Sequence, residues 1–216
     1  MDGQDLDRAK AQIDKMLREK EGERFKPYRC TAGVPTIGVG ATSYPDGRKV
    51  TMRDPPITAA RMNEMLAIEI DRAVDTVLEM VNHEATTQQL VALVVCAYNI
   101  GFAGLRGSSI VKAHNRGDFA SAAQAFGLWD KVRNPKTGQL ERDLGLAARR
   151  AQEAAVYLSG SLTSSRPTQA VASESKLSRS PLMQAGTAVT TAGIAVMNEA
   201  VTSPVIPAVP TLAQAN

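Results

Sequence analysis

The amino-acid sequence predicts an α+β fold in which a small antiparallel β element lies among helices. Apolar residues recur at helical spacing over residues 5–20 and 59–81, whereas residues 24–52 place glycines between β-branched residues instead. Of the 216 residues, 44% are hydrophobic and 22% are charged, which is typical of a globular chain. Aromatic residues make up only 4%, and this disfavours a β-sandwich.

The first predicted helix covers residues 5–20, and its apolar side chains form one stripe: Leu6, Ala9, Ile13, Met16 and Leu17. The β element follows over residues 24–52, where Pro45-Asp46-Gly47 is typical of a turn. Two arrangements of this segment stay open, a small antiparallel hairpin and a three-stranded sheet.

The rest of the domain predicts a bundle of helices. Thr58 is a suitable N-cap for a helix over 59–81, and the apolar run Leu90–Ala97 is long enough for a buried helix. Further helices are expected over three segments: 108–114, 118–126 and Ala147–Leu158.

Composition changes near residue 160. The serine-rich stretch Ser159–Pro167 predicts a linker. Residues 161–216 hold only 3 of the 25 basic and 2 of the 22 acidic residues. We therefore predict one globular domain at 1–160 and a Ser/Ala/Val/Pro-rich C-terminal tail at 161–216. Its uncharged segment 181–197 is either a marginal membrane-associating helix or part of a flexible tail, because it is short and rich in small residues.

Charge and cysteine content exclude several functions. The formal net charge of +3 is far from the dense positive charge of a nucleic-acid binder, so no nucleic acid is expected as a partner. Two cysteines rule out a disulfide-rich scaffold, and two histidines disfavour a metal site, so neither a metal nor another cofactor is expected. The polar N-terminus Met1–Asp5 lacks the pattern of a cleavable secretory signal peptide, and none is expected.

Glu21, at the end of the first predicted helix, is the candidate general acid. Shielding by a neighbouring lobe disfavours the charged form of a carboxyl group, as a proton donor requires near neutral pH. Cys30 and Thr36 fall in the β element, which would face Glu21 across a cleft. Spacing alone does not establish such a site, because a glutamate at a helix end is usually solvated.

The complete segment 21–40 resembles the phage-type lysozyme (endolysin) family. That family carries Glu-Gly, a tyrosine seven residues after the glutamate, Asp or Cys two residues further, and then Gly-x-x-Thr-Ile-Gly-x-Gly, and this sequence meets every spacing. Ala97–Gly101 with Ser108-Ser109 resembles a second block of the family, and Trp129 with Gly145–Glu153 resembles its ending. The resemblance covers residues 10–158 in order.

The resemblance implies a lysozyme-like fold, with a small antiparallel β lobe and a helical lobe joined by a long helix. It implies an endolysin (muramidase) that hydrolyses the β-1,4 bond between N-acetylmuramic acid and N-acetylglucosamine in peptidoglycan. Two alternatives stay open: a lytic transglycosylase, which forms an anhydro sugar without water, and a catalytically silent wall-binding protein.

The resemblance also implies roles for single residues. Glu21 aligns with the general acid and Thr36 with the residue that holds the attacking water. Cys30 stands where many members have Asp and a subset has Cys. An isolated thiol is mostly neutral near pH 7, so several roles of Cys30 stay open: a thiolate that replaces Asp, a neutral group that positions water, or an auxiliary residue. A half-buried residue without a role and a site of redox control stay open as well. Ser108 and Asn134 are further candidates for substrate binding.

Other residues are expected to be structural. Trp129 is predicted as an interlobe packing anchor rather than a sugar platform, and Cys96 as a core residue. Arg149, Arg150 and Glu153 are predicted as a charge cluster that supports a helix. Ala41 stands where the family commonly has His, which implies a changed supporting hydrogen bond.

The predicted partner is bacterial peptidoglycan. The family implies a monomer made in the host cytoplasm that reaches the cell wall (periplasm) through lesions formed by a membrane protein, a holin. The alternative is that the tail docks the protein to a phage particle or to the inner membrane.

Overall fold

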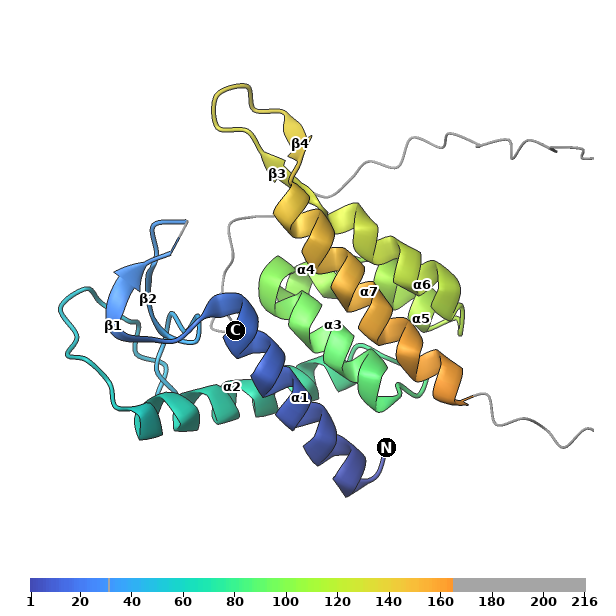
Figure 1. The fold of residues 1–216 in the computed structure, drawn as a ribbon, viewed down its shortest axis with the longest axis horizontal. Coiled ribbons are helices and arrows are strands. Elements are labelled where there is room, and N and C mark those ends of the chain that lie inside the picture. Colours follow the sequence, from blue (N-terminus) through green and yellow to red (C-terminus); the bar gives the residue numbers. More distant parts are fainter. Residues whose placement is uncertain (31, 165–216) are drawn as a thin grey trace, which may run out of the picture. The chain divides into compact units, whose positions relative to one another are not determined.

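The computed structural model describes residues 1–30 and 32–164 (Figure 1). The predicted membrane-associating segment 181–197 lies outside the described residues, as does all of the tail beyond residue 164. The described part confirms the predicted α+β architecture, because a small antiparallel β lobe and a helical lobe are both present.

The chain begins with α1 (Gly3–Glu21), whose N-cap Asp2 accepts a hydrogen bond from the Asp5 backbone N–H at 2.7 Å. Ala9, Ile13 and Leu17 are the buried residues of this helix, which confirms the predicted apolar stripe. Gly22 ends the helix at φ 72°, a conformation that favours glycine, and the chain turns there into the β lobe.

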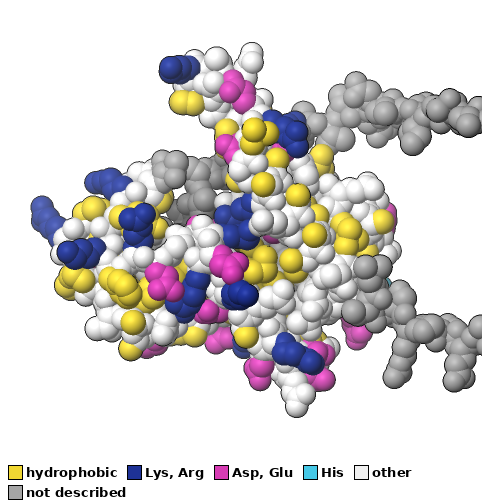
Figure 2. All heavy atoms as spheres, in the orientation of Figure 1, with side chains coloured by type: hydrophobic (Ala, Val, Ile, Leu, Met, Phe, Trp, Pro, Cys, Tyr) yellow, Lys and Arg dark blue, Asp and Glu magenta, His cyan; other side chains and the backbone are white. Residues whose placement is uncertain are grey.

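The β lobe is a two-stranded antiparallel hairpin of β1 (Arg24–Arg29) and β2 (Pro35–Gly38). Tyr28 lies opposite Thr36 in its register. Beyond β2, only isolated bridges extend the pairing, so of the two predicted arrangements the hairpin is the one observed. Figure 2 shows Lys and Arg side chains gathered on the viewed surface of this lobe.

The long helix α2 (Ala59–Leu78) connects the β lobe with the helical lobe, since it contacts β2 as well as α1 and α3 (Figure 1). Its N-cap is Thr58, as predicted, and the Thr58 side chain accepts a hydrogen bond from the Arg61 backbone N–H at 3.1 Å. The helix ends three residues before the predicted limit of 81.

The helical lobe surrounds α3 (Thr87–Ile100), which begins at a capping box between Thr86 and Gln89. Every residue from 89 to 98 on this helix is buried, so the predicted buried helix is confirmed. Around it lie α4 (Phe102–Gly107), α5 (Ser109–His114), α6 (Phe119–Phe126), a 3-10 turn (Gly127–Trp129) and α7 (Leu144–Ser164).

The structure differs from the sequence prediction in two places. Strands β3 (Lys131–Arg133) and β4 (Leu140–Arg142) form a second hairpin that was not predicted. Helix α7 continues to Ser164, so the predicted start of a linker at Ser159 is wrong. Gly160 packs closely here: a Cβ at this position would lie 2.1 Å from Thr86 Oγ1.

The main hydrophobic core is formed by buried side chains of the helices α1–α7, together with Trp129 of the 3-10 turn. A smaller cluster under the β lobe holds Ile37, Ala41, Tyr44, Val50 and Met65. Within residues 1–30 and 32–164, no helix has the length and apolar character needed to cross a membrane.

Candidate active site

Glu21 is the last residue of α1, and its side chain is 26% exposed. The guanidinium of Arg149, on α7, donates a hydrogen bond from Nη2 to Glu21 Oε1 at 3.1 Å. Arg149 also donates from Nε to Glu153 Oε1 at 3.2 Å. The predicted charge cluster is therefore present, but it also reaches the candidate acid, which the sequence prediction missed.

The turn after β2 packs directly on Glu21. Gly40 has φ +78°, and a Cβ added there would lie 3.7 Å from Glu21 Cγ and 3.8 Å from Tyr98 Cε1. The end of α1, the turn after β2 and the end of α3 thus meet at this carboxyl group. The side chain of Glu21 is held between the two lobes instead of extending into bulk solvent.

Thr36, on β2, is buried, with an exposed fraction of 2%. Its hydroxyl donates a hydrogen bond to the Val34 carbonyl oxygen at 2.9 Å. A hydroxyl oxygen has two lone pairs in addition to its one hydrogen. Because the hydrogen is used by the backbone, any further hydrogen bond of the Thr36 hydroxyl must be one that its oxygen accepts.

Tyr28 pairs with one predicted site residue, Thr36, and is influenced electrostatically by another, Glu21. Its backbone pairs with Thr36 across the hairpin. Burial raises the pKa of Tyr28 first, the negative charge of Glu21 adds to the rise, Arg24 opposes it, and Cys30 adds a smaller rise. Sequence reasoning had used Tyr28 only as part of the family motif, although its place two residues before Cys30 was a signal.

Cys30 is a free, half-buried cysteine at the end of β1. Its backbone N–H donates to the Val34 carbonyl at 3.0 Å, and its carbonyl accepts from the Gly33 N–H at 2.7 Å. The hairpin turn therefore fixes its position. Cys96 is free and fully buried, which confirms it as a core residue.

A second acidic group lies behind the site. The hydroxyl of Tyr98 donates a hydrogen bond to Glu69 Oε2 at 2.5 Å, and both side chains are buried. Burial raises the pKa of Glu69, and the hydrogen bond from Tyr98 opposes that rise. The pKa of Tyr98 is raised well above its ordinary value by burial, then by Glu69 and by Glu21.

The two predicted substrate-binding residues make hydrogen bonds within their own segments of the chain. Ser108 is buried and caps α5, since its Oγ accepts from the Val111 N–H at 3.3 Å. Asn134 organises the β3–β4 turn: its amide donates to Glu141 at 2.7 Å and its oxygen accepts from the Lys136 N–H at 2.8 Å. Their roles toward substrate stay predictions.

Trp129 is 4% exposed and packs on α4, where a Cβ on Gly104 would lie 3.2 Å from its ring. The predicted packing role is confirmed. This contact lies inside the helical lobe, and the interlobe position stays a prediction.

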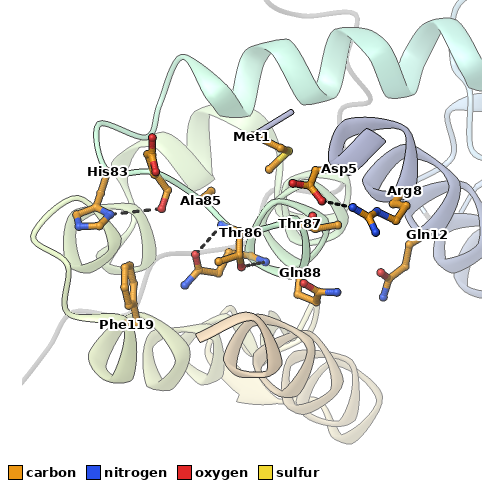
Figure 3. Close-up of a pocket in the computed structure, with 12 residues that line it drawn as sticks. Met1, Asp5, Arg8, Gln12, His83, Ala85, Thr86, Thr87, Gln88 and Phe119 are labelled. Carbon is orange, nitrogen blue, oxygen red and sulfur yellow. Dashed lines mark hydrogen bonds and ion pairs between the residues drawn. The ribbon is translucent and has the colours of Figure 1, made fainter. Parts of the chain in front are cut away.

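A hollow of about 780 Å³ lies at the other end of α1 (Figure 3). Asp5, Arg8 and Gln12 line it, together with residues from His83 to Gln89 and Phe119. Asp5 lies about 24 Å from Glu21 along the helix, at 1.5 Å per residue. This hollow contains none of the predicted catalytic residues. Among the described residues, no group of three or more His, Cys, Asp and Glu side chains could hold a metal ion.

A glutamate at the end of the first helix, held by an arginine of the last helix and packed against the turn after β2, is compatible with the carboxyl group that glycosidases use as a proton donor. The sequence pattern of the Phage lysozyme family matches residues 18–153, and the chain belongs to that family. The predicted family, lysozyme-like fold and hydrolase class are thereby confirmed.

Individual relatives agree. The chain is 34% identical over 143 residues to the endolysin of Salmonella phage P22. The aligned residues cover 66% of this chain and 92% of that protein. The structure of the endolysin from Escherichia coli O157:H7 phage FAHEc1 is similar, with a TM-score of 0.62, 32% identity, and coverage of 68% of this chain and 90% of that one. The muramidase domain of SpmX from Asticaccaulis excentricus has a TM-score of 0.58, 26% identity, and coverage of 68% and 95%.

Proposed function

We propose that this protein is an endolysin that hydrolyses the β-1,4 bond between N-acetylmuramic acid and N-acetylglucosamine in peptidoglycan, and so lyses bacteria. The observation that carries this proposal is the partly shielded Glu21 carboxyl group, held by Arg149 at 3.1 Å and packed against Gly40 in the turn that follows the strand of Thr36. The endolysin relatives and the muramidase domain among the similar structures support the same substrate. The basic surface of the β lobe suits a weakly anionic polymer (Figure 2).

In the proposed reaction, Glu21 donates its proton to the glycosidic oxygen. The bond between that oxygen and the anomeric carbon breaks, and the leaving sugar gains a hydroxyl group. Positive charge then develops on the ring. A water molecule held by the Thr36 oxygen adds to the anomeric carbon from the opposite face and gives its proton to solvent water, and the Glu21 carboxylate regains a proton from solvent before the next cycle. Arg149 stabilises the carboxylate that Glu21 becomes, because a charge-assisted hydrogen bond favours the anion.

The products separate this reaction from its alternatives. Hydrolysis of purified peptidoglycan yields reducing muramic acid ends, which mass spectrometry and a reducing-sugar assay both detect. Anhydro ends would identify a lytic transglycosylase. Binding to the wall without any cleavage would identify a silent wall-binding protein.

Thr36→Val tests the role assigned to the hydroxyl group. We expect a loss of hydrolysis on the order of a hundredfold, as is typical when a group that assists proton transfer or positions water is removed. Thr36→Ser retains a hydroxyl and restores most of the rate. If valine and serine have equal rates, the hydroxyl group has no part in the reaction.

Cys30 is proposed to act on the attacking water, since the hairpin turn fixes its backbone beside Tyr28 and Thr36. Cys30→Asp and Cys30→Ser distinguish the two forms of this role. A faster aspartate variant with a slow serine variant indicates that negative charge is needed. A serine variant as fast as the parent indicates a neutral group. Equal rates for all three remove Cys30 from the mechanism.

The route to the wall and the assembly state extend this proposal. We expect synthesis in the host cytoplasm and release through a holin, so induced cells lyse only when a holin is co-expressed. Membrane contact through the tail is tested by fractionating those cells with and without residues 161–216. Light scattering on the purified protein is expected to give the mass of a monomer.

A further inference from the structure

Behind Arg149 lies a second carboxylate that the proposed reaction does not use. Glu153 is completely buried, and its Oε1 accepts two hydrogen bonds, from Arg149 Nε at 3.2 Å and from Arg150 Nη2 at 2.9 Å. Arg149 is 14% exposed and Arg150 is 1% exposed. One guanidinium thus joins a buried carboxylate to Glu21 at the surface of the site.

The two contacts of Arg149 use different nitrogens. Its Nε donates to Glu153, and its Nη2 donates to Glu21. A guanidinium is planar and its N–H groups have fixed directions. Holding Nε therefore fixes where Nη2 points. Without Glu153, the long side chain of Arg149 would sample other rotamers, and its contact with Glu21 would be made less often.

Glu153 also sets the charge that faces Glu21. Arg149 and Arg150 carry two positive charges, and Glu153 reduces their sum to one. A general acid must hold a proton before the reaction and release it during the reaction. Without Glu153, two uncompensated positive charges would lie on the helix that contacts Glu21, and a nearby positive charge favours the charged form of a carboxyl group.

We propose that Glu153 is a positioning residue of the active site, which orients Arg149 toward Glu21 and offsets its positive charge. This inference rests on the proposed role of Glu21 as the general acid.

Other titratable groups interact with this cluster or with Glu21. They are Lys20 on α1, Tyr28 on β1, and Cys96 and Tyr98 on α3. Burial raises the pKa of Cys96, and Glu153 adds to the rise, so this thiol is neutral beside the cluster. The pKa of Lys20 is lowered by burial and then by Arg149. Among the described residues, Glu153 is the carboxylate bonded to both arginines.

A purely structural role makes a different prediction. Arg150 donates from Nη2 to Glu153, whereas its Nε and Nη1 are buried without a hydrogen-bond partner among the described residues. Glu153 therefore also holds Arg150 in place. Loss of Glu153 will therefore destabilise the fold. A structural role alone lowers the rate at every pH by the same factor and does not move the pH profile.

The test is a series of variants that changes the charge of the cluster. Counting Arg149, Arg150 and residue 153, the parent carries +1, Glu153→Gln carries +2, Arg150→Met carries 0, and the double variant returns to +1. The pH dependence of peptidoglycan hydrolysis is measured for each. The alkaline limb of this profile is the pH range in which activity falls as pH rises. We expect it to move to lower pH in Glu153→Gln by about half a pH unit or more, since a nearby charge shifts a titration by about this amount. In Arg150→Met it moves to higher pH.

The double variant is expected to return close to the parent profile. Glu64→Gln is the matched control, because Glu64 is an exposed carboxylate that also pairs with an arginine, Arg61, at 2.8 Å. It is expected to leave the limb unchanged. If Glu153→Gln does not fold, Arg150→Met and the double variant still predict different limbs.

The inference is overturned if every folded variant keeps the parent limb and only its maximal rate falls. That outcome leaves the proposed function intact, provided that Glu21→Gln is inactive. If Glu21→Gln retains the parent rate, the proposed function fails instead.

Discussion

The Tyr98 hydroxyl donates a 2.5 Å hydrogen bond to Oε2 of Glu69, and the ring of Tyr98 lies beside the same glycine, Gly40, that packs on Glu21. A buried carboxyl group therefore stands one side chain behind the candidate general acid. Burial raises the pKa of Glu69, so the folded protein favours its neutral form more than the unfolded chain does.

Glu69→Gln should change how stability depends on pH. A carboxyl group whose pKa is raised by folding contributes stability below its unfolded value of 4.5, and that contribution is lost as pH rises through the higher folded value. The melting temperature of the parent protein should therefore fall relative to that of Glu69→Gln as pH rises above about 4.5. Calorimetry from pH 3.5 to 8 measures the difference, and a constant difference over this range contradicts the assignment.

Tyr98→Phe removes the donor and leaves the Glu69 carboxyl group buried without it. An unsatisfied buried polar group costs about 1–3 kcal/mol, and we expect a loss of stability of this size. Urea denaturation at pH 7 measures it. In a Glu69→Leu background, the same tyrosine substitution should cost less. Equal costs in both backgrounds would show that the hydrogen bond contributes no coupling energy.

Gly40→Ala and Gly47→Ala separate backbone strain from contact with the site. Both glycines have positive φ, +78° and +87°, so an alanine at either position should destabilise the fold by about 1–2 kcal/mol. Only Gly40 has Glu21 within 4 Å of the added Cβ. We expect Gly40→Ala to lower hydrolysis several-fold and Gly47→Ala to leave it unchanged. Equal activity in the two folded variants contradicts the placement of Glu21 against this turn.

The two cysteines should differ in reactivity. Cys96 is fully buried, and burial raises its pKa, whereas Cys30 is half-buried at a turn. A thiol must be accessible and deprotonated to react. An aromatic disulfide reagent should therefore modify one thiol rapidly in the native protein and two after unfolding. The Cys30→Ser protein should show no rapid reaction, and a rapid native reaction there would contradict the burial of Cys96.

Helical periodicity in the sequence predicted the helices that bury one apolar face against the core. Ile13 and Leu17 recur at four residues, and both are completely buried on α1. The β3–β4 hairpin was missed for a physical reason: each strand has three residues, and Val132 and Arg133 are exposed, so no alternating apolar pattern exists to be read.

Tertiary packing determines two features that local sequence patterns do not predict, the end of α7 and the contact between Arg149 and Glu21. The serines around Ser159 favour a linker, but α7 packs along α3 and Gly160 lies against Thr86, so the helix continues (Figure 1). Arg149 and Glu153 are four residues apart on one helix, which made their pairing predictable. The contact of Arg149 with Glu21 joins residues 128 apart in sequence and depends on how α7 meets α1.

The most direct test of the central claim is the rate at which Glu21→Gln releases reducing ends from purified peptidoglycan. The matched control is Glu19→Gln on the same helix, where the side chain is 61% exposed. Both variants must keep the parent melting transition. We predict that Glu19→Gln retains the parent rate, whereas Glu21→Gln loses at least a hundredfold, as expected when a general acid is removed. A Glu21→Gln protein that releases reducing ends at the parent rate would contradict the account.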